Sequence, residues 1–91
     1  MTKVLIVKRC SRKDIPTLPK QVKNKLEEWI DRVEENGIDA VRKIPGYHDE
    51  PLKGTRKGER SARMSKGYRV IYFEEQKSIL IVVVEVNKHD Y

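Results

Sequence analysis

The residues best suited to chemistry are two arginines that flank a short turn and two proton-transferring side chains at the end of the sequence. Arg63 and Arg69 stand on either side of Lys66-Gly67, a dipeptide typical of a hairpin turn. If this hairpin forms, both guanidinium groups project from one face and can hold a phosphate through paired hydrogen bonds. His89 and Tyr91 are two residues apart, so an extended strand points the imidazole and the phenol in the same direction.

Groups of these types suit the cleavage of RNA by its own 2′-hydroxyl. That reaction needs a base for the hydroxyl, a cation for the charged phosphorane and an acid for the leaving 5′-oxygen. Glu50, which precedes Pro51 in the segment that leads to the hairpin, is a candidate carboxylate for proton transfer. Non-catalytic binding of nucleic acid needs the cations alone, and the residues by themselves favour it over cleavage.

Basic residues are concentrated in one segment. The formal net charge is +6, from 20 Lys and Arg against 14 Asp and Glu. Residues 53–69 contain seven bases and one acid, whereas the rest of the chain has thirteen of each. This imbalance predicts a surface that faces a polyanion, with nucleic acid as the leading partner and an acidic protein as the second. A solvated basic face without a ligand is the alternative. Besides the two arginines, the candidate RNA-binding cations are Lys53, Arg56, Lys57, Arg60 and Lys66.

Metal and cofactor chemistry has little support. His48-Asp49-Glu50 and His89-Asp90 contain ligand types, but neither has two histidines at a helical or hairpin spacing. No glycine-rich phosphate loop ends in Gly-Lys-Ser/Thr. We therefore expect neither a metal nor a cofactor. The single cysteine, Cys10, excludes an internal disulfide and is predicted to be a small buried residue in a reducing compartment.

Length and composition indicate one small folded domain over residues 1–91. Hydrophobic and charged residues each make up 37% of the chain, but the hydrophobic ones occur in blocks, which argues against disorder. The longest uncharged apolar run, residues 79–84, is far shorter than the ~20 residues of a membrane span. Lys8 and Arg9 interrupt the apolar start, so no signal-peptide core is expected. These features predict a soluble cytoplasmic domain.

The first half of the sequence predicts a strand followed by two helices. Residues 1–9 have a strand composition, and residues 11–19, with two prolines, read as a turn region. A long helix is predicted next and ends at Asn36-Gly37, since glycine accepts the left-handed conformation. A second short helix follows and is closed by Pro45-Gly46, and residues 47–58 are expected to form a loop. The apolar stripe of the long helix, which includes the expected core residue Trp29, is Val22, Leu26, Trp29, Ile30 and Val33.

The second half predicts three consecutive strands. Residues 60–65 and 68–73 form the hairpin, and residues 79–86 form a strand that is apolar on both faces and therefore central. The order β-α-α-β-β-β indicates an α+β fold. We expect a small, mostly antiparallel four-stranded sheet with two helices packed on one face, which leaves the other face open to a partner.

The same residues resemble the RelE/YoeB/HigB superfamily of type II toxin–antitoxin toxins. The matching pieces occur in order along almost the whole chain: Leu18-Pro19-Lys20, Glu50-Pro51-Leu52-Lys53-Gly54, Arg60-Ser61-Ala62-Arg63, Gly67-Tyr68-Arg69-Val70-Ile71-Tyr72 and His89-Asp90-Tyr91. The resemblance implies a RelE-like fold and a ribosome-dependent mRNA endonuclease that cuts in the A site by the 2′-hydroxyl route. It also implies a tightly bound, often acidic antitoxin and a toxin–antitoxin hetero-oligomer.

Roles for individual residues follow from the resemblance. Glu50 is similar to a carboxylate base, Arg69 to the phosphate-binding arginine and Arg63 to the arginine of the preceding strand. His89 and Tyr91 resemble a terminal acid/base pair, although Asp90 separates them here. Which residue is the base and which the acid stays open. Two other functions remain as alternatives: a ParE-like inhibitor of DNA gyrase, and an RNA- or ribosome-binding module without catalysis.

Overall fold

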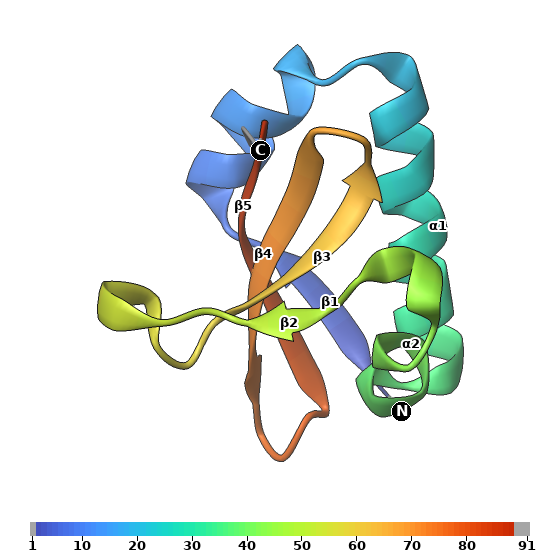
Figure 1. Ribbon diagram of the computed structural model, residues 1–91, viewed down its shortest axis with the longest axis vertical. Helices are drawn as coiled ribbons and strands as arrows, with labels where there is room; N and C mark the ends of the chain where they lie inside the picture. Colours follow the sequence, from blue (N-terminus) through green and yellow to red (C-terminus); the bar gives the residue numbers. More distant parts are fainter. Residues whose placement is uncertain (1, 89–91) are drawn as a thin grey trace.

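Five strands form one mixed sheet in the order β1-β5-β4-β3-β2 (Figure 1). The computed structural model describes residues 2–88. β1 runs parallel to β5, and all the other neighbouring pairs are antiparallel. The mostly antiparallel α+β fold is therefore confirmed, but the sheet has one strand more than expected. The strands are β1 (Lys3–Ile6), β2 (Glu50–Pro51), β3 (Arg60–Ser65), β4 (Tyr68–Glu75) and β5 (Leu80–Lys88).

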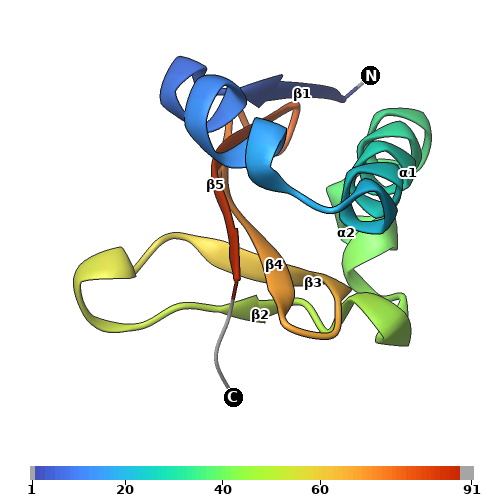
Figure 2. The ribbon, with the colours of Figure 1, turned by 90° about the horizontal axis from the view of Figure 1, so that it is seen from above.

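The two expected helices are present and lie on one side of the sheet. Helices α1 (Lys20–Asn36) and α2 (Ile38–Arg42) are seen on the same side of β3, β4 and β5 in Figure 2. Gly37 separates them at a φ of +86°, and its N–H donates to the Val33 carbonyl at 2.8 Å. A residue with a Cβ atom rarely adopts this conformation, which explains why the chain turns at the predicted position.

Residues 10–17 form helical turns rather than the expected turn region. The turns are η1 (Cys10–Asp14) and η2 (Ile15–Thr17), and the extended chain of β1 ends earlier than predicted. Tertiary contacts hold these turns in place. Cys10 is fully buried, and the Val86 N–H of β5 donates to Asp14 Oδ2 at 3.1 Å. A partner 72 residues away in the sequence leaves no local signal, so the prolines of this segment suggested a less regular structure.

The strand β2 was not predicted: it lies within residues 47–58, which were expected to form a loop. It is only two residues long and is fixed by the register Glu50↔Ser61 and Pro51↔Arg60. Two residues cannot show the alternation by which a strand is recognised in a sequence. The strand β5 lies between β1 and β4, so its predicted central position is confirmed.

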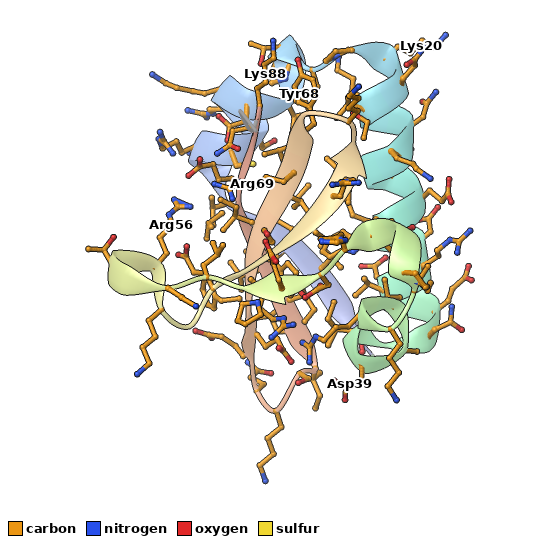
Figure 3. All side chains as sticks on the ribbon, viewed as in Figure 1. Lys20, Asp39, Arg56, Tyr68, Arg69 and Lys88 are labelled. Carbon is orange, nitrogen blue, oxygen red and sulfur yellow. The ribbon has the colours of Figure 1, made fainter. Side chains whose placement is uncertain are left out.

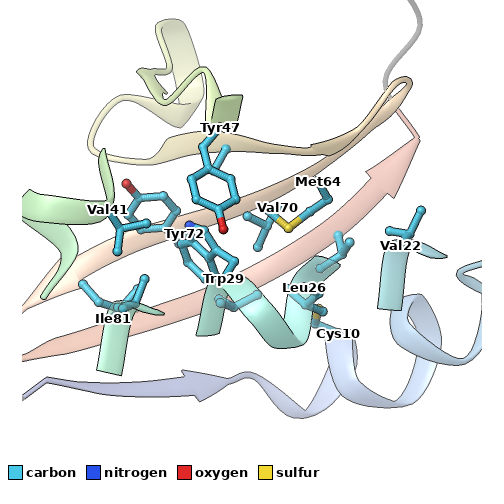
Figure 4. Packing of buried hydrophobic residues seen from close by; sticks show 14 of the residues in the cluster. Cys10, Val22, Leu26, Trp29, Val41, Tyr47, Met64, Val70, Tyr72 and Ile81 are labelled. Atoms are coloured by element: carbon cyan, nitrogen blue, oxygen red, sulfur yellow. The ribbon is translucent and has the colours of Figure 1, made fainter. Parts of the chain in front are cut away.

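The core lies between α1 and the sheet, and its largest side chains are aromatic (Figure 4). Trp29 is fully buried, as the helical stripe predicted, and its ring centroid lies 5.4 Å from that of Tyr72. The apolar stripe of α1 meets one face of β3, β4 and β5, and this face contributes Ala62, Met64, Val70, Tyr72, Ile81, Val83 and Val86. We call the opposite side of the sheet the open face.

Cys10 gives the fold a specific sensitivity to alkaline pH. Burial, with a smaller contribution from Asp14, raises the pKa of the Cys10 thiol from 9.0 to about 11. Above about pH 9 the unfolded thiol ionises while the folded thiol stays protonated, so stability is lost as the pH rises. We expect the free energy of unfolding to fall by up to about 1.4 kcal/mol per pH unit in this range. Urea unfolding measured from about pH 8 to about pH 10 tests this.

The matched variant is Cys10→Ala, which removes the titrating group. It should be less stable at neutral pH, because it leaves a small cavity, but its stability should depend less on pH between pH 9 and 10. A decline of equal slope in both proteins would show that another group is responsible.

Candidate functional site

The two arginines of the hairpin lie next to each other on the open face. The register pairs Arg63 with Arg69 across β3 and β4, and Arg69 with Asn87 across β4 and β5. Directly opposed residues of antiparallel strands project to the same face. Val70 lies in the core, so its neighbour Arg69 points away from it. The predicted common face of the two arginines is therefore confirmed.

Arg69 has an unused hydrogen-bond donor. Its side chain is partly buried, and its Nε is fully buried with no hydrogen-bond partner among residues 2–88. A buried N–H without an acceptor costs free energy, so the hydrogen-bonding capacity of Arg69 is not fully used within the described chain. Arg63 is exposed on the neighbouring strand. The two arginines thus place two guanidinium groups on neighbouring strands. The Nε of Arg69 is a hydrogen-bond donor without an acceptor in the described chain.

Two carboxylates stand on either side of these arginines, in the adjacent row of the sheet. The register Glu50↔Ser61↔Ile71↔Glu85 runs across β2, β3, β4 and β5. Neighbouring strands are about 4.8 Å apart, so the backbone of Glu50 lies about 10 Å from β4, whereas Glu85 is on the adjacent strand. Glu50 is exposed at the edge of the sheet, and Glu85 is partly buried.

Glu85 is bound on both of its oxygens. Arg56 Nη2 lies 2.5 Å from Glu85 Oε1, and the side-chain amide of Asn87 donates to Oε2. Arg56 belongs to η4 (Gly54–Arg56), and it also pairs with Glu59 at 3.5 Å. Arg56 extends from η4 toward the strands, on the side of the molecule where Arg69 lies beside β4 (Figure 3). Arg56, one of the predicted RNA-binding cations, is therefore held in an ion pair with Glu85 on the open face.

Glu85 is not among the site residues predicted from the sequence. The available signal was its position as the one acid within Leu80–Lys88, a strand that is otherwise almost entirely apolar up to Val86. A charge in the middle of a central strand needs a partner or a function, because burying it alone is costly. Here the partners come from η4 and from the same strand, which the sequence order does not reveal.

The remaining predicted cations fall into two groups. Lys53, Lys57 and Lys66 are exposed, the first two beside η4 and the third in the hairpin turn. Arg60, in contrast, is turned away from the open face, and its Nε donates to Asp49 Oδ1 at 2.7 Å. The structure thus brings Arg56, Arg63 and Arg69 to one face and binds Arg60 in a different cluster.

His89 and Tyr91 lie outside the described residues. The described part of β5 ends at Lys88, which pairs with Tyr68, directly after the row that contains Arg69 and Asn87. Residues 2–88 contain no group of three metal-ligating side chains. None of the helices in this part of the chain is both long and apolar enough to cross a membrane.

No protein-family model and no curated protein sequence matches this chain. Solved structures do match over almost its whole length. YafQ from E. coli has a TM-score of 0.75 and 22% identity, over 97% of this chain and 93% of its own. RelE in the RelE–RelB complex from Pyrococcus horikoshii has a TM-score of 0.71 and 24% identity, over 96% and 93% of the two chains.

The match with the YoeB–YefM complex from Staphylococcus aureus has a TM-score of 0.70 and 20% identity, over 99% of each chain. High coverage in both directions means that the likeness extends over the whole domain. This chain therefore has the fold of the RelE, YoeB and YafQ toxins, as the resemblance in its sequence implied.

Proposed function

We propose that this protein is the toxin of a type II toxin–antitoxin system and that it cuts mRNA on the ribosome. The observation that carries the proposal is the pairing of Arg63 and Arg69 on the open face, with the buried Nε of Arg69 lacking an acceptor among residues 2–88. A phosphate diester supplies the negative charge and the oxygen acceptors that such a pair requires. The shared fold with the toxins supports the same function.

In this proposal the arginines bind the scissile phosphate and stabilise the charge that develops on it. The 2′-hydroxyl attacks the adjacent phosphorus, the bond to the 5′-oxygen breaks, and a cyclic phosphate remains. Protons move between RNA and the candidate acid/base residues Glu50, His89 and Tyr91, so the route needs no metal ion. Glu50 shares the open face with the arginines, and its neighbour Ser61 precedes Arg63 by two residues on β3.

The ribosome would supply the orientation that this open site lacks. Glu50 stands two strands from Arg69, so these two candidate groups are separated across the sheet. Fixing the substrate in a reactive geometry can remove several kcal/mol from a barrier. An mRNA held in the A site provides such geometry, which supports ribosome-dependent cleavage over cleavage of free RNA.

An antitoxin is the proposed protein partner. Two of the matching structures contain a toxin bound to its antitoxin, RelB in one and YefM in the other. We propose that an acidic segment of the antitoxin covers the cations of the open face and keeps RNA away from them. Ordering of such a segment on the toxin is a common form of coupled folding and binding.

Cleavage-site mapping by primer extension on mRNA-programmed ribosomes tests the proposal. The wild-type protein is compared with Arg69→Ala, and ribosome-free RNA serves as the control. Cuts that require both the ribosome and Arg69 are the expected result. The absence of cuts under every condition would reject the nuclease, and an assay of gyrase supercoiling would then examine the alternative toxin activity.

Binding of the protein to ribosomes should weaken as salt is added. Each cation that neutralises a phosphate releases counterions, so the affinity falls with a slope of about −0.7 per contact on a single strand. With three to five such contacts we expect an affinity loss of about 10²-fold between low and moderate salt. Measuring the dissociation constant over this range tests the prediction, and a salt-independent affinity would contradict the phosphate contacts.

Replacing Glu85 by glutamine should strengthen the binding of single-stranded RNA. The change removes one negative charge from the open face and weakens the hold on Arg56. Partly exposed ion pairs contribute up to about 1 kcal/mol, so we expect an affinity gain of about two- to fivefold in fluorescence anisotropy. Glu75→Gln, an exposed carboxylate at the end of β4, is the control for net charge. Equal gains in the two variants would mean that the Arg56–Glu85 contact has no specific effect.

A further inference from the structure

Asp49 is the buried centre of a polar cluster on the helix side of the sheet. Its side chain is only 1% exposed, although it comes from the segment between Tyr47 and β2. Arg60 Nε donates to Asp49 Oδ1 at 2.7 Å, and the Tyr72 hydroxyl donates to Oδ2. Arg42 Nε lies 3.9 Å from Oδ1. Each carboxylate oxygen therefore has at least one partner of its own.

These partners belong to three different elements. Arg42 is the last residue of α2, Arg60 begins β3, and Tyr72 lies in the middle of β4. Arg42 also contacts Glu74 on β4, which fixes the arginine from a second side. Burial and the hydrogen bond to Asp49 raise the pKa of Tyr72, so its hydroxyl keeps the proton that it donates. The cluster thus connects Asp49, the residue before β2, to α2, β3 and β4.

Besides this cluster, β2 is held by its pairing with β3 and by the Leu52 N–H, which donates to the Glu59 carbonyl at 2.9 Å. Both of its residues are exposed, it lies at the edge of the sheet, and β3 is its single neighbouring strand. One of the two residues is Pro51, which has no backbone N–H to donate. His48, directly before Asp49, has a left-handed φ of +46°, so the backbone turns sharply as it enters this segment. A bent, short edge strand needs an anchor if its side chains are to keep a fixed direction.

Asp49 and Glu50 are neighbours on opposite faces: Asp49 contacts Arg60 and Tyr72 on the helix side, whereas Glu50 is paired with Ser61, which faces away from the core. When Asp49 is fixed on the helix side, Glu50 is directed to the open face, opposite Ser61 and one row from Arg63. We propose that Asp49 is a positioning residue that holds the Glu50 carboxylate in place for proton transfer. This inference rests on the proposed function, in which Glu50 contacts the RNA. It also gives Arg60 a role through Asp49 rather than through phosphate.

The test is a double-mutant cycle between Asp49 and Glu50 in the ribosomal cleavage assay. Asp49→Asn keeps the shape of the side chain but loses its charge, and a carboxylate displaced by about 1 Å can cost about 10²-fold in rate. We expect Asp49→Asn to lower the single-turnover rate by about 10–10²-fold, with little change in the ribosome concentration needed for half-saturation. In a Glu50→Gln background the same substitution should have almost no effect, because nothing remains to be positioned.

Tyr72→Phe is the second variant, in case Asp49→Asn folds poorly. It removes the donor to Oδ2 and leaves the ring packing in place, so a smaller rate loss of about tenfold or less is expected, again absent in the Glu50→Gln background. Val33→Ala is the matched control, since it removes buried core volume on α1 at a residue that forms no hydrogen bond or ion pair of the Asp49 cluster. Its thermal midpoint should fall as much as that of Tyr72→Phe without a comparable loss of cleavage.

Three results would overturn the inference. Equal rate losses from Asp49→Asn in the presence and absence of the Glu50 carboxylate would show a structural role alone. A rate loss in Val33→Ala that matches its loss of stability would lead to the same conclusion. Full cleavage activity in Glu50→Gln would show that the Glu50 carboxylate is not needed, so Asp49 would have nothing to position. The proposed nuclease activity would still stand in that case. A wild-type protein that never cuts mRNA would instead reject the proposed function itself.

Discussion

Replacing Arg69 by alanine is expected to lower the rate of mRNA cleavage by about 10²–10⁴-fold. Arg69 lies on β4 in the open face, and in the strand register it stands opposite Arg63 of β3 and Asn87 of β5. Its buried Nε has no acceptor within residues 2–88, and in the proposed mechanism the charge of this arginine lies where the phosphorane forms. Arg69→Lys should recover part of the activity, because it restores the charge but not the planar pair of donors.

Stability and cleavage should separate in these variants. Arg69 Nε has no hydrogen bond to lose within the described chain, so the thermal midpoint of Arg69→Ala should stay close to that of the wild type. Arg32→Ala is the matched control, since Arg32 is an exposed arginine of α1 whose ion pair with Glu28 lies away from the open face. Full cleavage activity in Arg69→Ala, or an equal loss in Arg32→Ala, would remove Arg69 from the site.

Trp29→Ala is expected to destabilise the fold by about 3–5 kcal/mol. The indole is fully buried between α1 and the sheet and packs against Tyr72 at a ring separation of 5.4 Å (Figure 4). A loss of this size is a large fraction of the about 5–15 kcal/mol that stabilises a typical domain. Urea unfolding followed by far-ultraviolet circular dichroism is the suitable measurement, because the variant has no tryptophan fluorescence.

Trp29→Phe provides the comparison. Trp29 Nε1 is buried without a hydrogen-bond partner among the described residues, so phenylalanine loses volume but no hydrogen bond. We expect a cost of less than about 1.5–2 kcal/mol for this change. A Trp29→Ala protein as stable as the wild type would contradict the central position of the indole. The ring of Tyr72 packs on Trp29 and its hydroxyl donates to Asp49, so the cavity in Trp29→Ala should lower cleavage together with stability.

The elements with strong local signals could be predicted from the amino-acid sequence alone. The stripe that ends at Gly37 predicted α1 because helical periodicity and a positive φ are properties of a few adjacent residues. The Lys66-Gly67 turn predicted the hairpin. The shared face of Arg63 and Arg69 depends in addition on a register shift between Arg63 and Ser65, because regular pairing counted from the turn would place Arg63 opposite Val70. The two-sided apolar strand predicted the central position of β5.

Tertiary contacts set which of the basic side chains stay on the surface and which are bound within the fold. Seven bases between residues 53 and 69 look alike in the sequence, but Arg60 binds Asp49 and Arg56 binds Glu85, at separations of 11 and 29 residues. The strand β2 and the burial of Asp49 depend in the same way on partners in β3 and β4. Contacts of this kind form when distant segments meet in the folded chain, and neither composition nor periodicity contains the information that specifies them.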